Sequence, residues 1–225
     1  MTPGQPLPAA LLAERPEAVR EGGANLLKQI DNIRAHGVTP VVAINAFPDD
    51  HPSEHDAIRE LCQSVGVKAV VATHVRDGGQ GAQALAEALI EAIDESRDAG
   101  NGFHFLYPDE LPLTEKIERI ATRLYGADGV DFAPAARSRL EAWQGQGYGE
   151  LPVCIAKTHL SLSHEAGRLG APRGWRLPVR EVRLSAGAGF VYALCGDILT
   201  LPGLGPSPAA TRIDIDENGT TVGLY

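Results

Sequence analysis

Apolar residues in the first hundred positions follow two spacings, one helical and one extended. The helical spacing predicts a helix from Glu17 that closes at His36-Gly37, with apolar positions at Val19, Ala24, Leu27, Ile30 and Ile33. The run at 38–44, broken only by Thr39-Pro40, is typical of a buried strand in a parallel sheet, and 67–72 predicts a second one. Further helices are predicted at 53–65, capped by Ser53, and at 82–93. We therefore expect an α/β fold in which residues 1–98 form part of a doubly wound parallel sheet.

Asp98-Ala-Gly-Asn-Gly102 is the strongest internal boundary in the chain. Beyond it we expect a smaller α+β C-terminal region over residues 99–225. The predicted helices are at 113–125 and 134–143, and the predicted strands are at 151–156, 176–184, 189–195 and 212–224. Ser185 to Gly189 is expected to form a tight turn between two of these strands.

The chain has 225 residues, 44% of them hydrophobic, and a net charge of −9. This charge argues against a nucleic-acid partner and against a basic patch for membrane binding. The N-terminus lacks the profile of a signal peptide, and no apolar run reaches transmembrane length. Three cysteines, Cys62, Cys154 and Cys195, lie among apolar neighbours without metal spacing, so we expect buried free thiols in a cytoplasmic protein.

Three local motifs match known sites and are rejected. His51-Pro-Ser-Glu-His55 fits an inverted zinc-protease signature, but Pro52 and Ser53 start a helix that leaves His51 outside it. Asp214 to Gly219 copies half of a calcium loop, yet its twelfth position is Tyr225, and Asn218-Gly219 suits a hairpin turn. Gly187-Ala-Gly189 lacks the third glycine of a dinucleotide fingerprint. The sequence predicts no metal site and identifies no catalytic residue.

Two strand ends are better candidates for a ligand site. The strand at 38–44 leads directly into Asn45, Phe47 and Pro48, and ligands bind at the carboxyl ends of strands in open α/β sheets. The second strand leads into a loop with Gly78 and Gly79, where glycines let the backbone approach a ligand. The alternatives are that Phe47 only covers the core and that the glycines belong to an ordinary βα turn.

Several segments match one family in order and spacing. The first is Asn25 to Arg34, followed by Gly37-Val38 and by Asn-x-Phe-Pro at 45–48. The others are at 115–121, 124–130, 151–158, 179–203 and 208–216. Together they span about Leu12 to Tyr225 and resemble the C-terminal portion of formate–tetrahydrofolate ligase.

The resemblance implies a reaction in two steps. Formate attacks ATP, bound with Mg²⁺, to give formyl phosphate, and tetrahydrofolate then takes the formyl group on N10. In the family the aromatic and proline of Asn-x-Phe-Pro form one face of the folate slot, which carries over to Phe47 and Pro48, and an apolar position of the slot carries over to Val71. The opposite face is a Trp in the family, where this sequence has Val75.

The family's phosphate-binding loop has no counterpart in this sequence, which contains no G-x-x-x-x-G-K-[ST]. The resemblance thus predicts a chain that is inactive without its P-loop half and that pairs with an N-terminal P-loop partner chain. It also implies a homo-oligomer. The alternative is a non-catalytic module, derived from that family, that binds a pterin or serves oligomer assembly.

Overall fold

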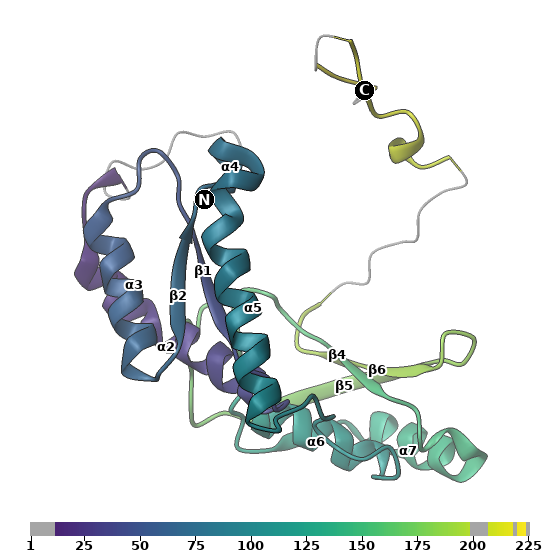
Figure 1. The fold of residues 1–225 in the computed structure, drawn as a ribbon. Coiled ribbons are helices and arrows are strands. Elements are labelled where there is room, and N and C mark those ends of the chain that lie inside the picture. The colour runs from purple at the N-terminus through teal and green to yellow at the C-terminus, as the bar shows by residue number, and fades with distance from the viewer. Residues whose placement is uncertain (1–11, 199–206, 218–219, 224–225) are drawn as a thin grey trace.

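The computed structural model describes residues 12–198, 207–217 and 220–223. The first part of the chain is a three-layer arrangement in which two parallel strands lie between helices (Figure 1). Its elements, in order, are α2 (Pro16–Arg34), β1 (Val41–Asn45), α3 (Pro52–Ser64), β2 (Lys68–Ala72), α4 (His74–Asp77), the 3₁₀ turn η1 (Gly78–Ala82) and α5 (Gln83–Asp98). This arrangement confirms the predicted α/β class.

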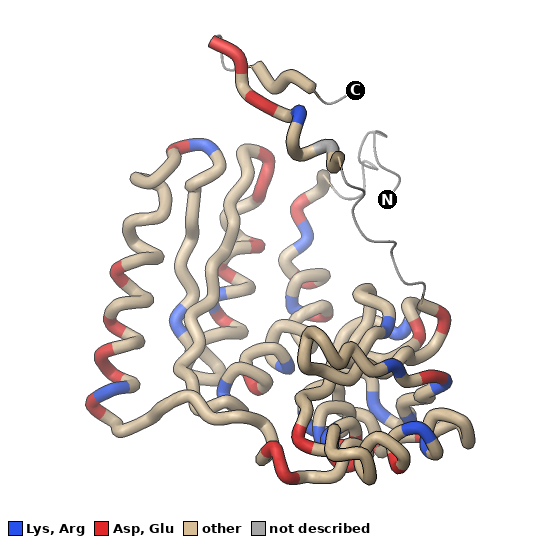
Figure 2. The backbone as a smooth tube through the Cα atoms, turned by 90° about the vertical axis from the view of Figure 1, so that its right-hand side faces the viewer, with Lys and Arg blue, Asp and Glu red and all other residues tan. Residues whose placement is uncertain are grey.

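The two strands run in register from Val41 opposite Lys68 to Asn45 opposite Ala72. Helices α2 and α3 cover one face of this pair and α5 covers the other, and acidic residues follow the outer side of α5 (Figure 2). A small core of Ile30, Cys62 and Val67 fills the α2–α3 side. Helices on both faces of a parallel pair are the doubly wound arrangement that the alternating pattern predicts.

Helix α3 begins one residue earlier than expected. Pro52 occupies its first turn, His51 is the N-cap residue, and Ser53 lies inside the helix rather than capping it. Proline suits this position because its missing N–H would have no partner there. His51 therefore lies outside the helix, which confirms the expectation on which the zinc motif was rejected.

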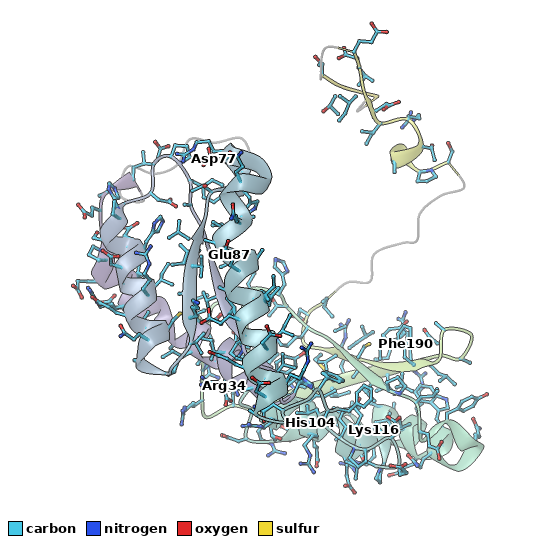
Figure 3. The ribbon with its side chains drawn as sticks, in the orientation of Figure 1. Arg34, Asp77, Glu87, His104, Lys116 and Phe190 are labelled. Carbon is cyan, nitrogen blue, oxygen red and sulfur yellow. The ribbon has the colours of Figure 1, made fainter. Side chains whose placement is uncertain are left out.

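The second part of the chain packs two helices against one four-stranded sheet. Its elements are α6 (Leu113–Arg123), β3 (Val130–Phe132), α7 (Pro134–Trp143), the π-helical turn η2 (Gln144–Tyr148), β4 (Val153–Ala156), β5 (Leu177–Ser185) and β6 (Phe190–Cys195). The strand order is β3-β5-β6-β4, with β5 and β6 antiparallel and the outer strands parallel to their neighbours. The Gly189 N–H donates to the Ser185 carbonyl at 2.8 Å, which confirms the tight turn between β5 and β6. Phe190 lies beside that turn (Figure 3).

This second part has its own core, and one predicted burial was wrong. Leu113, Ile117, Leu177 and Val182 belong to a cluster that fills the space between the helices and the sheet. Cys154 was expected to be buried but is exposed, because β4 is an outer strand whose side chains alternate: Val153 faces the core and Cys154 faces away. Cys62 and Cys195 are buried, as expected.

Helix α2 ties the two parts together. Asn25 donates to the Gly170 carbonyl at 3.0 Å, and Lys28 donates to the Arg123 carbonyl at 2.8 Å. The predicted division of the chain at residues 98 and 99 stays a prediction. Toward the C-terminus, η3 (Ala209–Thr211) precedes a short antiparallel pair, β7 (Asp214–Ile215) and β8 (Thr221–Val222); the expected turn at 218–219 lies outside the described residues.

Candidate functional site

The carboxyl ends of β1 and β2 lie side by side. Asn45 is aligned with Ala72, and the next residue, Ala46, donates its N–H to the Ala72 carbonyl at 3.0 Å. Beyond this bond the segments that follow the two strands separate: residues 46–51 form a turn after β1, and residues 73–82 form a longer loop after β2. The two candidate segments named from the sequence therefore start at the same edge of the sheet.

The first of these segments is a tight turn that presents Phe47. The Phe47 N–H donates to the Asp50 carboxylate at 2.8 Å, and the Asp50 N–H donates back to the Phe47 carbonyl at 3.1 Å. These bonds leave the Phe47 side chain 53% exposed, with Pro48 exposed beside it. This exposure disfavours the alternative that Phe47 serves only to cover the core.

Asp50 has a second partner on α3. The Nε2 atom of His55 lies 3.2 Å from the same carboxylate oxygen that accepts the Phe47 N–H. The hydrogen bond from Phe47, followed by the one from His55, holds the pKa of Asp50 below its ordinary value. An ionised carboxylate here links the turn to the first turns of α3.

The second segment carries Val75 on the short helix α4. The Val75 side chain is 64% exposed, while Val71, within β2, is half-buried and aligned with Ile44. After α4 the backbone turns at Gly78, whose φ of +58° suits glycine, and passes the exposed Gly79. Val75 therefore offers apolar surface to solvent from the loop next to the Phe47 turn.

The loop is closed at its base by backbone contacts. The Thr73 N–H donates to the Gly81 carbonyl at 3.0 Å, and a Cβ on Gly81 would lie 2.6 Å from the Thr73 carbonyl carbon. Asp77, at the tip of the loop (Figure 3), accepts hydrogen bonds from Arg76 and then from Thr73, which lower its pKa to about 2. Gly81 is thus the glycine whose missing side chain permits the closure.

Asn45 lies at one end of a groove of about 430 Å³ along β1. The groove runs between α2, β1 and α3 and also includes Asp50 and His55. The structure thus groups Asn45 with the Phe47 turn, and it places Val75, Gly78 and Gly79 on the adjacent loop. Sequence reasoning missed Asp50 and His55, although the turn-forming Pro-Asp-Asp after Phe47 was a usable signal.

Within residues 12–198, 207–217 and 220–223, no group of three or more His, Cys, Asp or Glu side chains lies close enough together to hold a metal ion. Within the same ranges, no helix combines the length and apolar composition needed to cross a membrane.

Comparison with known proteins identifies one family throughout. The family model described as formate–tetrahydrofolate ligase matches residues 2–225. The chain is similar to the formate–tetrahydrofolate ligase of Saccharopolyspora erythraea, with 59% identity over 98% of this chain, and to that of Cutibacterium acnes, with 53% identity over 99%. It is also 55% identical, over 99% of its length, to formate–tetrahydrofolate ligase 3 of Rubrobacter xylanophilus.

These relatives are much longer than this chain. The matched region makes up 38% of the Saccharopolyspora protein, 39% of the Cutibacterium protein and 40% of the Rubrobacter protein. With a family model that covers nearly every residue and relatives above 50% identity, the chain belongs to the formate–tetrahydrofolate ligase family.

Proposed function

We propose that this chain forms the tetrahydrofolate-binding part of a formate–tetrahydrofolate ligase, an enzyme of folate one-carbon metabolism. The observation that carries the proposal is the paired end of β1 and β2. Asn45 lies opposite Ala72, and each strand is followed by an exposed apolar side chain, Phe47 after β1 and Val75 after β2. Apolar side chains on two adjacent loops fit the two faces of a flat pterin ring.

The Phe47 turn supplies the stacking face. The Phe47 ring lies against the pterin, Pro48 restricts the backbone that presents it, and Asp50 holds the Phe47 backbone. Val71 adds apolar surface at the base of the slot, and Val75 covers the opposite face without an aromatic ring.

The remaining candidates line the slot. Asn45 offers an exposed amide at the strand end, where it can donate to and accept from the ligand. Gly78 and Gly79 leave the backbone beside Val75 without side chains, so that this part of the loop can approach the ligand closely.

The proposed reaction has two steps. A formate oxygen attacks the γ-phosphorus of ATP, ADP leaves, and formyl phosphate is formed. The N10 amine of tetrahydrofolate then attacks the formyl carbon, phosphate leaves, and N10 loses its proton to give 10-formyltetrahydrofolate. We assign the first step to the portion of the ligase that this chain does not contain.

The lysines support that assignment. Phosphoryl transfer depends on cationic and backbone donors held at the phosphates, and this sequence has no phosphate-binding loop. Each of the four lysines already donates to groups of the chain itself: Lys28 to Asp31, Lys68 to Glu91, Lys116 to the Gly149 carbonyl and Lys157 to the Thr158 carbonyl. Each of these four side chains thus already has a partner within the chain.

One observation favours a second candidate function. Val75 stands where the resemblance places a Trp, and a pterin stacked on one ring instead of two would bind less tightly. A non-catalytic pterin-binding or oligomer-assembly module would tolerate this loss. In either case we propose a homo-oligomer that works in the cytoplasm, as the resemblance and the free cysteines lead us to expect.

The test uses the purified 225-residue chain in two assays. We expect calorimetric titration to detect tetrahydrofolate binding that Phe47→Ala weakens, while a coupled assay detects no formate-dependent release of ADP. The ligase of Saccharopolyspora erythraea serves as the positive control in both. Release of ADP by the chain alone overturns the assignment of the first step, and an absence of tetrahydrofolate binding overturns the folate-binding role.

A further inference from the structure

Strand β1 has a free edge. Among the described residues its sheet contains only β1 and β2, and the Ala46 N–H points to β2, where it bonds to Ala72. Because hydrogen-bonding residues alternate along a parallel strand, the backbone groups of Val42 and Ile44 also face β2. The N–H and carbonyl groups of Ala43 therefore face away from β2, and Ala43 is exposed.

Two apolar grooves flank this edge, one on each face of the sheet. The α2–α3 groove, of about 430 Å³, runs between β1 and helices α2 and α3 and includes Leu26 and Ile58. The α5 groove, of about 340 Å³, lies between the chain entering β1 and α5 and includes Leu89 and Ile93, which are 49% and 48% exposed. A strand added beside β1 would direct alternate side chains into the two grooves, since successive side chains point to opposite faces.

The outer edge of β2 differs from that of β1. It begins with Lys68, an exposed side chain that forms an ion pair with Glu91 of α5. Lysine on an edge strand hinders the pairing of a further strand, whereas the sequence Val-Val-Ala-Ile-Asn of β1 carries no charge. The free edge of β1 is thus the one open to strand addition.

Resting on the proposed function, we propose that the free edge of β1 binds a strand from the part of the ligase that this chain does not contain. The region that matches this chain makes up only 38–40% of each relative, so most of each relative lies outside the match and can supply that strand. Its side chains are apolar on both faces, to fill the α2–α3 groove and the α5 groove. The continuous apolar run from Val41 to Ile44 is typical of a strand in a parallel sheet whose two faces are both covered.

The test compares this chain with a chimaera. In the chimaera the chain replaces the matching 38% of the Saccharopolyspora erythraea ligase, to which it is 59% identical. We expect amide hydrogen exchange at Ala43 to be fast in the chain alone and to slow by about 100-fold or more in the chimaera. Ala43→Pro removes only an outward N–H, so it should lower the melting temperature of the chimaera more than that of the chain.

Ala69→Pro is the matched control, because by the same alternation the Ala69 N–H faces the outer edge of β2. It should shift both proteins equally. The proposal is overturned if amide exchange at Ala43 is equally fast in the chain and the chimaera, or if exchange slows at Ala69 instead. It is also overturned if exchange at Ala43 slows in the chain alone as its concentration is raised, because a second copy of the chain then occupies the edge. Tetrahydrofolate titration of the chimaera is read separately: slowed exchange at Ala43 without folate binding retains the interface and rejects the proposed function.

Discussion

The Phe47 backbone N–H donates a 2.8 Å hydrogen bond to the Asp50 carboxylate. The Asp50 N–H closes the same turn from the other end by donating to the Phe47 carbonyl at 3.1 Å. His55 approaches the carboxylate from α3 at 3.2 Å. A turn held in this way orders the Phe47 ring before a ligand arrives, which reduces the entropy lost on binding.

The first prediction concerns this carboxylate. Asp50→Ala leaves the Phe47 N–H without its partner, and we expect unfolding to require about 1 kcal/mol less free energy. Tetrahydrofolate binding, measured by calorimetry, should weaken several-fold. Asp50→Asn keeps an oxygen acceptor at the same position and should retain most of the affinity. Equal affinities for the alanine variant and the unchanged chain would contradict a positioning role.

The acid dependence of stability gives a second prediction. The Phe47 and His55 hydrogen bonds lower the pKa of Asp50 in the folded state, so the unfolded state takes up the proton first as pH falls. The contribution of Asp50 to stability is therefore complete above about pH 5 and is lost as pH falls through the lowered folded-state pKa. The melting temperature of the unchanged chain should exceed that of Asp50→Asn at neutral pH. The difference should shrink in acid, whereas a constant difference would rule out this linkage.

A third prediction concerns the second wall of the slot. Val75 is 64% exposed, so Val75→Trp has room for its ring and should tighten tetrahydrofolate binding by about 0.5–1.5 kcal/mol, or roughly two- to tenfold. Val75→Leu adds apolar bulk without a ring and should gain less. Phe47→Ala should weaken binding. If the Trp variant instead shows unchanged affinity and a lower melting temperature, Val75 does not line the slot.

The fourth prediction concerns a buried charge in the second part of the chain. Lys116 of α6 (Figure 3) is fully buried and donates to the carbonyls of Gly149 and Leu151 at 2.8 and 3.0 Å. Lys116→Met keeps the apolar stem but leaves both acceptors unpaired, at a cost of about 1–3 kcal/mol in unfolding free energy. Lys68→Met removes an exposed ion pair and should cost about 0–1 kcal/mol. Urea denaturation measures the unfolding free energy of both variants. Similar decreases for Lys116→Met and Lys68→Met would show that the buried hydrogen bonds of Lys116 add no stability.

The sequence predicted the elements that carry a clear period and missed features that depend on contacts. Helix α2 and strands β1 and β2 were predicted because their apolar residues recur at helical or extended spacing. Their burial is less complete than that spacing suggests, since Ala24 and Ile33 of α2 and Ala43 of β1 are exposed. Strand β3 was missed because three residues are too few to show a period. The hydrogen bond from the Phe47 N–H to the Asp50 carboxylate was missed, because a bond between a side chain and the backbone of a turn depends on the turn's geometry.

Lys116 combines a position that the sequence pattern predicts with a contact that it does not predict. Its position was readable, since Leu113, Lys116, Ile117 and Ile120 share one helical face at spacings of three and four residues. A lysine on an apolar face usually extends its charged end to solvent. Here the turn after α7 brings the Gly149 carbonyl to the amine, and that contact joins residues 33 apart in the chain.

The last prediction tests which glycine the loop around Val75 requires. A Cβ on Gly81 would lie 2.6 Å from the Thr73 carbonyl carbon and 2.8 Å from the His74 nitrogen, so Gly81→Ala forces the closed base of the loop apart. We expect Gly81→Ala to lower the free energy of unfolding by about 1–3 kcal/mol. Gly79→Ala, where a Cβ meets nothing within 4 Å, should be neutral or stabilise by about 0.4–1 kcal/mol through the unfolded chain. Because the same base orients α4, Gly81→Ala should also weaken tetrahydrofolate binding. Equal urea midpoints for the two variants would show that Thr73 and Gly81 do not need their close approach.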